Sequence, residues 1–263
     1  MAEEPVHIPG MDSDISHILE RWDYVPGQVV VRRFVGKDGR EKIQLRVDLG
    51  LLQMNVNGRP DGKRPFGHPS LLEFHEAKLK QHRARHDGDD ERFSLKAEDC
   101  ARLQMEAIQY HHRYICLLQL EDFAAVLRDT ARNLRVMDLV ARYAESEDIA
   151  WSIEQFRPQL LLIDTRARAT RSLKNKDYPA AIQHVEAGLE RIRQFYHHHE
   201  RTDLIEHSAE LRALEEWQDE LNRDRPLTPR ERLELDLREA LKREDYETAA
   251  RVRDALRELE TLE

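Results

Sequence analysis

The sequence has little of what disulfide scaffolds, zinc sites and membrane spans require. Its 263 residues include 2 cysteines, Cys100 and Cys116, too few for a disulfide framework or a four-thiolate zinc site. No apolar run reaches the length of about eighteen residues that marks a membrane span, and the start MAEEPVHIPG lacks the features of a signal peptide. We therefore expect a soluble, cytoplasmic protein whose cysteines lie reduced in its core.

Glycine, proline and aromatic residues are also scarce. The chain has 10 glycines, 10 prolines and 6% aromatic residues, whereas 35% of its residues are charged, with both signs mixed. This balance is typical of long helices with solvated faces rather than of an all-β domain. Since 40% of the residues are hydrophobic, the chain can still bury a substantial core.

The short motifs that mark many enzymes are missing as well. The sequence contains no Walker loop, no dinucleotide-binding glycine fingerprint, no GxSxG and no cysteine–histidine nucleophile pair in a supporting context. Its densest histidine cluster, His197 to His199, places adjacent side chains about 100° apart on a helix, so the three cannot face one ion. We predict no catalytic residue, no functional metal site and no cofactor.

Charge is distributed unevenly along the chain. The formal net charge is -9, yet residues 28–86 are basic, while residues 1–27 and the remainder of the chain are acidic. An acidic protein repels a polyanion unless basic residues gather in one place. Residues 28–86 are therefore the segment from which nucleic-acid binding is conceivable.

A small basic β region over residues 28–76 follows an acidic lead-in over residues 1–27. Apolar residues alternate in QVVVRRFVG and in EKIQLRVDL, and Asp38-Gly39 supplies a turn between them. This pattern predicts an antiparallel β-hairpin, and the next apolar run, GLLQMNV, predicts a third strand.

A charged linker and a helical body follow the β region. Residues 77–93 show no apolar periodicity beyond Leu79, which predicts an exposed linker. Residues 94–222 repeat apolar residues at steps of three and four, which predicts stacked antiparallel helical hairpins. The expected fold is therefore mainly α with a small antiparallel β part.

Three helix junctions share an aspartate followed by an aromatic residue, with alanines nearby. The junctions are Asp122-Phe123, Asp177-Tyr178 and Asp245-Tyr246. At each, we expect the aspartate to cap the second helix, the ring to fill the corner, and the alanines to let the backbones approach. The middle hairpin, with Ala181 and Gly188, is similar to a tetratricopeptide repeat.

The last segment, residues 227–263, predicts a two-helix hairpin. Thr228, Pro229 and Glu231 form a capping-box pattern at its start. The apolar residues of its two arms fall on two facing seams. These residues are Leu233, Leu237, Ala240 and Leu241 in the first arm and Ala249, Val252, Leu256 and Leu259 in the second.

This hairpin resembles the UVR motif, found in the excision-repair proteins UvrB and UvrC and in some Clp-protease regulators. The matching residues are Leu233, Leu237, Ala240, Tyr246, Glu247, Ala249, Ala250, Arg253, Asp254, Leu256 and Leu259. The rest of the chain lacks the helicase, nuclease and paired CxxC motifs of those proteins. The resemblance implies a protein–protein contact in which two UVR hairpins pair as a small four-helix bundle.

We therefore predict a non-catalytic bacterial interaction protein, linked to DNA repair or to the regulation of proteolysis, that does not engage a membrane. Its partner would be a protein that carries another UVR hairpin, or a second copy of the chain. The residues expected to contact the partner are Leu233, Leu237, Tyr246, Ala249, Ala250, Arg253, Asp254 and Leu256. In the alternative, the hairpin is the last pair of the helical stack, and Arg253 and Asp254 are merely solvated.

A nucleic-acid-associated accessory protein is the rival interpretation. The basic residues that would contact phosphates are Arg32, Arg33, Arg46, Arg59, Lys63 and Arg64. Phe34, Phe66 and Phe74 are the phenylalanines available to stack on bases, and at least one is expected in the core. In the alternative, Arg59 and Arg64 pair with carboxylates of the same chain and hold the β region in place.

Overall fold

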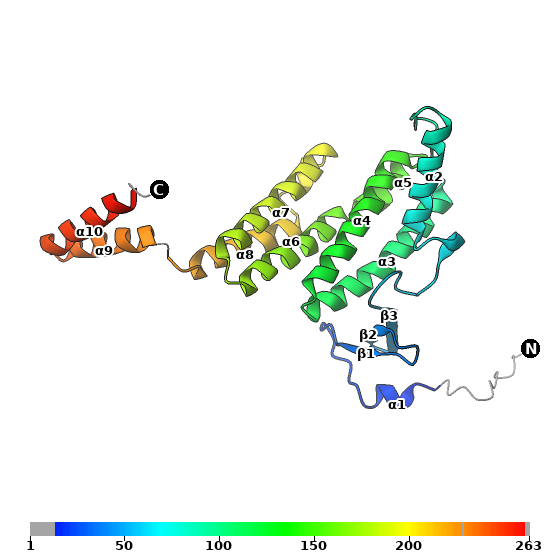
Figure 1. Ribbon diagram of the computed structural model, residues 1–263, viewed down its shortest axis with the longest axis horizontal. Coiled ribbons are helices and arrows are strands. Elements are labelled where there is room, and N and C mark those ends of the chain that lie inside the picture. The colour runs from blue at the N-terminus through cyan, green and yellow to red at the C-terminus, as the bar shows by residue number, and fades with distance from the viewer. Residues whose placement is uncertain (1–13, 228, 261–263) are drawn as a thin grey trace, which may run out of the picture. The chain divides into compact units, whose positions relative to one another are not determined.

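The computed structural model of the protein describes residues 14–227 and 229–260 (Figure 1). The chain divides into two compact units, Met1–Glu215 and Glu216–Glu263. The fold is mainly α, with a three-stranded antiparallel sheet on the N-terminal side, as predicted. Within the described ranges, no helix combines the length and the apolar character that crossing a bilayer requires.

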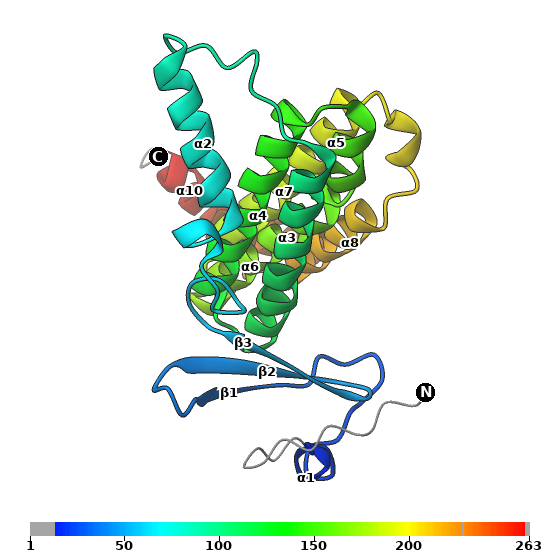
Figure 2. The same ribbon diagram turned by 90° about the vertical axis from the view of Figure 1, so that its right-hand side faces the viewer.

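The first unit begins with a short helix and a small sheet. Helix α1 (Ser16–Leu19) precedes strands β1 (Val31–Val35), β2 (Glu41–Val47) and β3 (Gly50–Asn55), which pair in the order β1-β2-β3. The predicted hairpin and third strand are confirmed. Gly39 adopts the positive φ of 72° in the turn between β1 and β2. In Figure 1 and Figure 2 the sheet lies at one end of α3 and α4, and α1 lies on the side of the sheet that faces away from these helices.

Helix α2 (Leu71–Arg85) occupies much of the segment that the sequence predicts to be an exposed linker. The prediction was wrong up to residue 85 because the helix buries a narrow stripe that includes a histidine. Leu72, His75 and Leu79 recur at steps of three and four and are buried. Because a histidine, His75, occupies one of the buried positions of this stripe, the apolar residues alone do not show the period of a helix. Ser70 caps the helix by accepting the N–H of Leu72.

The helical body consists of helices that follow one another along the chain. They are α3 (Ala97–Gln119), α4 (Phe123–Tyr143), α5 (Glu147–Glu154), α6 (Arg157–Lys174) and α7 (Tyr178–His198), and α8 (Ala209–Asp224) crosses the boundary between the units. Short 3-10 helices occupy Pro65–Gly67 and Thr202–Leu204. Helix α3 packs on α4, α4 on α6, and α6 on α7, side by side in Figure 1. The predicted stack of helices is confirmed.

The three aspartate–aromatic junctions share one backbone geometry. Asp122, Asp177 and Asp245 each accept a backbone N–H from three residues onward, which caps the second helix as predicted. The N–H of each aspartate also donates to a carbonyl five residues earlier, which closes the first helix. The preceding residues have positive φ: Glu121 at 58°, Lys176 at 60° and Glu244 at 56°.

Gly188 marks a close approach between α6 and α7. A Cβ atom at this position would lie 2.2 Å from Oγ1 of Thr165, so a larger residue would push the two helices apart. Ala181, near the start of α7, is fully buried. The expectation that small residues let the backbones of this hairpin approach is confirmed.

A buried ion pair that no sequence pattern predicted joins the sheet to the helices. Arg113 on α3 donates two hydrogen bonds, of 2.7 and 2.8 Å, to the carboxylate of Asp129 on α4. Each of these side chains is 1% exposed. Arg113 also donates to the carbonyl oxygens of Asn55 at 2.9 Å and Gly58 at 2.7 Å, which ties the end of β3 to the helices.

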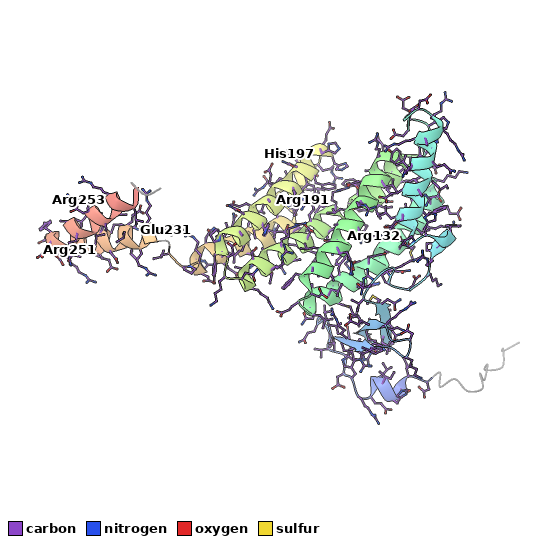
Figure 3. All side chains as sticks on the ribbon, in the orientation of Figure 1. Arg132, Arg191, His197, Glu231, Arg251 and Arg253 are labelled. Atoms are coloured by element: carbon purple, nitrogen blue, oxygen red, sulfur yellow. The ribbon has the colours of Figure 1, made fainter. Side chains whose placement is uncertain are left out.

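Glu106 on α3 is the centre of a second buried cluster. Its carboxylate accepts a hydrogen bond from Arg132, which Figure 3 labels on α4, and lies 3.2 Å from Nε of Arg59. It also accepts the N–H of Leu71 at 2.9 Å, at the start of α2. The guanidinium carbon of Arg132 lies 4.2 Å from the ring centroid of Tyr110. Because buried charges are costly unless paired, this cluster holds the loop before α2 against the helical body.

We predict that Asp129→Asn lowers the free energy of unfolding by about 3 kcal/mol, because the charge of Arg113 would stay buried without its counter-ion. Urea denaturation followed by far-ultraviolet circular dichroism measures this change. As a control, Glu98→Gln removes the carboxylate of an exposed helical pair with Arg102, which lies 2.5 Å away. The control should change stability by less than about 0.5 kcal/mol. Equal effects would contradict a structural role for the buried pair.

Candidate functional site

The second unit contains a hairpin of two helices, α9 (Pro229–Lys242) and α10 (Tyr246–Glu260). At its corner the N–H of Asp245 donates to the carbonyl of Ala240 at 2.9 Å and closes α9. The Asp245 carboxylate accepts the N–H of Thr248 at 3.0 Å, and this hydrogen bond lowers the pKa of Asp245. The corner is therefore built by local hydrogen bonds.

The two helices meet along a seam of alanines and leucines. Ala240 of α9 and Ala249 of α10 are buried, which lets the helices approach closely near the corner. The leucines of the seam, Leu233, Leu237 and Leu256, remain only half-buried. The hairpin thus keeps apolar surface that its own two helices do not cover.

One side of α10 combines an exposed aromatic ring with positive charge. Tyr246, Ala250, Arg253 and Arg257 recur at steps of four, three and four, so they share this side of the helix. Tyr246 is 69% exposed. Arg253, labelled on α10 in Figure 3, places its Nε 3.6 Å from the carboxylate of Asp254, and both side chains face solvent.

The residues predicted to contact a partner therefore lie in three settings. Ala249 is enclosed between the two helices, so it sets their spacing. The half-buried residues are Leu233, Leu237, Ala250 and Leu256, and the exposed residues are Tyr246, Arg253 and Asp254. The half-buried and exposed residues are the ones that a partner could touch.

Two expectations for the hairpin were wrong. Leu241 was predicted to face the second helix, but it is 51% exposed, because it lies about 100° around α9 from the buried Ala240. Tyr246 was predicted to fill its corner, as the buried Phe123 does at the start of α4. The ring of Tyr246 is exposed because the two helices α9 and α10 do not extend over it.

The start of α9 is held by an ion pair. Glu231 accepts two hydrogen bonds from Arg225, of 2.5 and 2.8 Å, and both side chains are partly exposed. Thr228 of the predicted capping box lies outside the described residues. The carboxylate in the first turn of α9 also suits the positive end of the helix dipole.

The comparisons with known proteins point to the same segment. The family model of the UvrB/uvrC motif matches residues 230–262, which cover nearly all of α9 and α10. The chain therefore contains a UVR motif at its C-terminal hairpin, as the resemblance implies. No curated protein and no solved structure matches the chain.

Several of the basic residues predicted to face nucleic acid make contacts within the chain. Arg46 is buried and donates to the carbonyl oxygens of Trp22 at 2.8 Å and Gly50 at 3.0 Å. Arg33 forms an ion pair of 2.6 Å with Asp122 at the start of α4. These two arginines hold the lead-in and the helical body to the sheet.

The other four basic residues predicted to face nucleic acid differ in what their side chains contact. Arg59 pairs with Asp61 at 3.1 Å and with the buried carboxylate described above, as the internal-pairing alternative expects. Arg32 donates to Gln44 at 2.8 Å. Lys63 and Arg64 are exposed, and Arg64 donates to a backbone carbonyl at 3.3 Å rather than to a carboxylate.

The outer face of α2 (Leu71–Arg85) was not predicted, because residues 71–76 were assigned to the β region and residues 77–85 to an exposed linker. Phe74, Lys78 and Gln81 follow one another at steps of four and three, which places them on one side of the helix. This spacing was visible in the sequence. Elsewhere in the ranges that the structure describes, no group of 3 or more histidine, cysteine, aspartate or glutamate side chains is arranged to hold a metal ion.

We predict that Asp245→Ala loosens α10, because the N–H of Thr248 loses its acceptor in the first turn. Amide hydrogen exchange in α10, measured on the full chain by mass spectrometry, should become about five times faster. Asp254→Ala is the matched control, since it removes an exposed carboxylate from the middle of the same helix. If both substitutions accelerate exchange equally, the capping role assigned to Asp245 is wrong.

Proposed function

We propose that the protein is a non-catalytic interaction protein that docks a partner through the α9–α10 hairpin. The proposed partner is a second helical hairpin with an apolar stripe, from another UVR-containing protein or from a second copy of this chain. The observation that carries the proposal is the half-covered seam of Leu233, Leu237 and Leu256. Leu241 and Tyr246 add exposed apolar surface on the same two helices.

The size of the second unit supports this proposal. A single core in a chain shorter than about 70 residues rarely contributes more than about 3–5 kcal/mol of stability, and Glu216–Glu263 is well below this length. Each apolar Å² removed from water contributes roughly 25 cal/mol. A second hairpin laid on the seam would cover its leucines and complete a four-helix bundle.

Charge on α10 indicates what kind of hairpin fits. Arg253 and Arg257 share the side of Tyr246, so a partner with acidic residues beside its apolar stripe would be complementary there. Exposed ion pairs add little affinity on their own. In this proposal the charges on α10 select the partner, and the apolar seam supplies the affinity.

The cellular setting is part of the same proposal. UVR motifs occur in excision-repair proteins and in regulators of Clp proteases, so we place the protein in bacterial DNA repair or in the control of proteolysis. Cys100 and Cys116 are free and buried, in keeping with a reducing cytoplasm. The α6–α7 pair, with its close contact at Gly188, is a tetratricopeptide-like unit in this proposal.

The rival function, phosphate binding through residues 28–86, has weaker support at the positions first expected. Arg33 and Arg59 form ion pairs within the chain, and Arg46 is buried against backbone carbonyls. Side chains that are already paired would have to give up these contacts before they could neutralise phosphates.

We predict that Ala250→Glu weakens partner capture by about tenfold or more, because it introduces a charge beside the apolar seam. Affinity purification from the native cell with the full chain as bait, quantified by mass spectrometry, measures the captured partner. Circular dichroism should show almost unchanged helix content, because Ala250 is only half-buried.

Ala101→Glu is the matched control, since the same substitution is made at an exposed alanine of α3, outside the hairpin. This variant should capture the partner about as well as the wild-type chain. Capture by Ala250→Glu at the wild-type level would contradict docking through this face. Capture that falls steeply as salt rises would instead indicate a contact dominated by charge.

A further inference from the structure

An exposed aromatic ring stands at the edge of the first unit, in the loop before α2. Phe66 is 64% exposed and adopts a positive φ of 52°, a conformation that is uncommon for a bulky residue. Its ring stacks on Phe74 of α2, with centroids 4.3 Å apart and planes inclined by 23°. One face of the Phe66 ring is thus held by Phe74 while most of the side chain faces water.

The loop that presents Phe66 is held by contacts on both sides of it. Arg64 donates to the carbonyl oxygen of Gly67 at 3.3 Å, and the N–H of His68 donates to the carbonyl of Pro65 at 2.9 Å. On either side of this loop, Arg59 and the N–H of Leu71 contact the buried carboxylate of Glu106, which holds both ends of the segment. The exposed ring therefore has a preset position rather than a position that binding must create.

A groove beside this ring is basic. It has a volume of about 530 Å³, and its lining includes His68, Phe74, Lys78, Lys80 and Gln81 but no carboxylate. Nζ of Lys78 lies 5.0 Å from the ring centroid of Phe74. No ion pair among the described residues involves Lys78 or Lys80.

The carboxylates nearest along α2 are engaged elsewhere. Glu76 forms an ion pair with Arg135 at 2.5 Å, and Glu73 accepts a hydrogen bond from Ser70. They are therefore not paired with the lysines of the groove. An anionic ligand that offers a flat ring would complement both the charge and the shape of this surface.

We propose that Phe66, His68, Phe74, Lys78 and Lys80, here called the Phe66 platform, bind single-stranded nucleic acid. An unstacked base lies on the free face of Phe66, and neighbouring phosphates lie near the two lysines. A duplex is disfavoured because its bases are stacked on one another and cannot lie on the ring. Single-stranded DNA and RNA share this chemistry. The platform differs from the arginines first predicted for nucleic acid and is independent of the hairpin.

Fluorescence anisotropy with the full chain tests the proposal. The probes are labelled oligothymidylate and oligouridylate of about 15 nucleotides, and a duplex of the same length, at about 50 mM salt. Both single strands should bind, and the duplex should bind at least about tenfold more weakly. The ratio of the affinities for the DNA and RNA probes shows which of the two is preferred. Absence of binding to both single strands overturns the proposal.

Phe66→Leu tests stacking, because leucine keeps an apolar side chain and removes the ring. It should weaken single-strand binding about 5- to 100-fold, whereas Phe66→Trp should retain binding and show tryptophan quenching on addition of the strand. Phe156→Leu, at another exposed phenylalanine of the first unit, is the control and should bind normally. Wild-type affinity in Phe66→Leu overturns the proposal.

The double substitution Lys78→Gln and Lys80→Gln tests the phosphate contacts. It should lower the slope of log affinity against log salt by about 0.7 per lysine, while Lys37→Gln with Lys96→Gln should leave the slope unchanged. Displacement of the oligonucleotide by polyglutamate as effectively as by unlabelled oligothymidylate would identify a site for acidic peptides and overturn the proposal. Ala250→Glu in the hairpin should bind the strand normally, which separates this test from that of docking.

Discussion

The buried ion pair between Arg113 and Asp129 is the contact on which the arrangement of the first unit depends. A charge enclosed in protein is tolerated only when counter-ions and hydrogen bonds satisfy it, so both residues must keep their places. Arg113 uses its remaining donors for the carbonyls of Asn55 and Gly58, which fixes where β3 ends. The neighbouring cluster around Glu106 extends the same constraint to the loop before α2 and to the first backbone N–H of that helix. The sheet, the loop and the helices are thereby joined by polar contacts as well as by the apolar core.

The two units differ in how completely they bury their apolar side chains. The first unit encloses a large core that includes Ile43, Leu103 and Val136, and it can therefore hold Phe66 outward on a rigid loop. The second unit has two helices whose close approach is set by Ala240 and Ala249, and its leucines stay half-covered. An exposed ring on a constrained loop suits a ligand with flat bases, whereas an incomplete helical seam suits another helical hairpin. The proposed functions therefore use different parts of the chain and different forces.

Much of the fold followed from local sequence patterns. Alternating apolar residues around Asp38-Gly39 predicted the hairpin of β1 and β2, and three aspartates predicted the caps of α4, α7 and α10. The UVR resemblance located the hairpin that the family model matches. Helix α2 was missed because His75 occupies an apolar position in its buried stripe, where a pattern of leucines alone shows no period. The exposure of Leu241 was missed because this residue lies about 100° around α9 from the buried Ala240. The exposure of Tyr246 was missed because an amphipathic pattern does not say how many neighbours an element has.

The sequence by itself determined the features that depend on residues within a few positions of one another. These are the strands and their turn, the helix corners capped by an aspartate, and the UVR hairpin. Only the tertiary structure decided which charges are paired and which rings are exposed. Arg113 meets carbonyls that lie 58 and 55 positions away, and Arg33 meets a carboxylate 89 positions away. Contacts over such separations depend on how the whole unit packs, because a side chain then meets the residues that lie near it in three dimensions rather than those near it in the sequence.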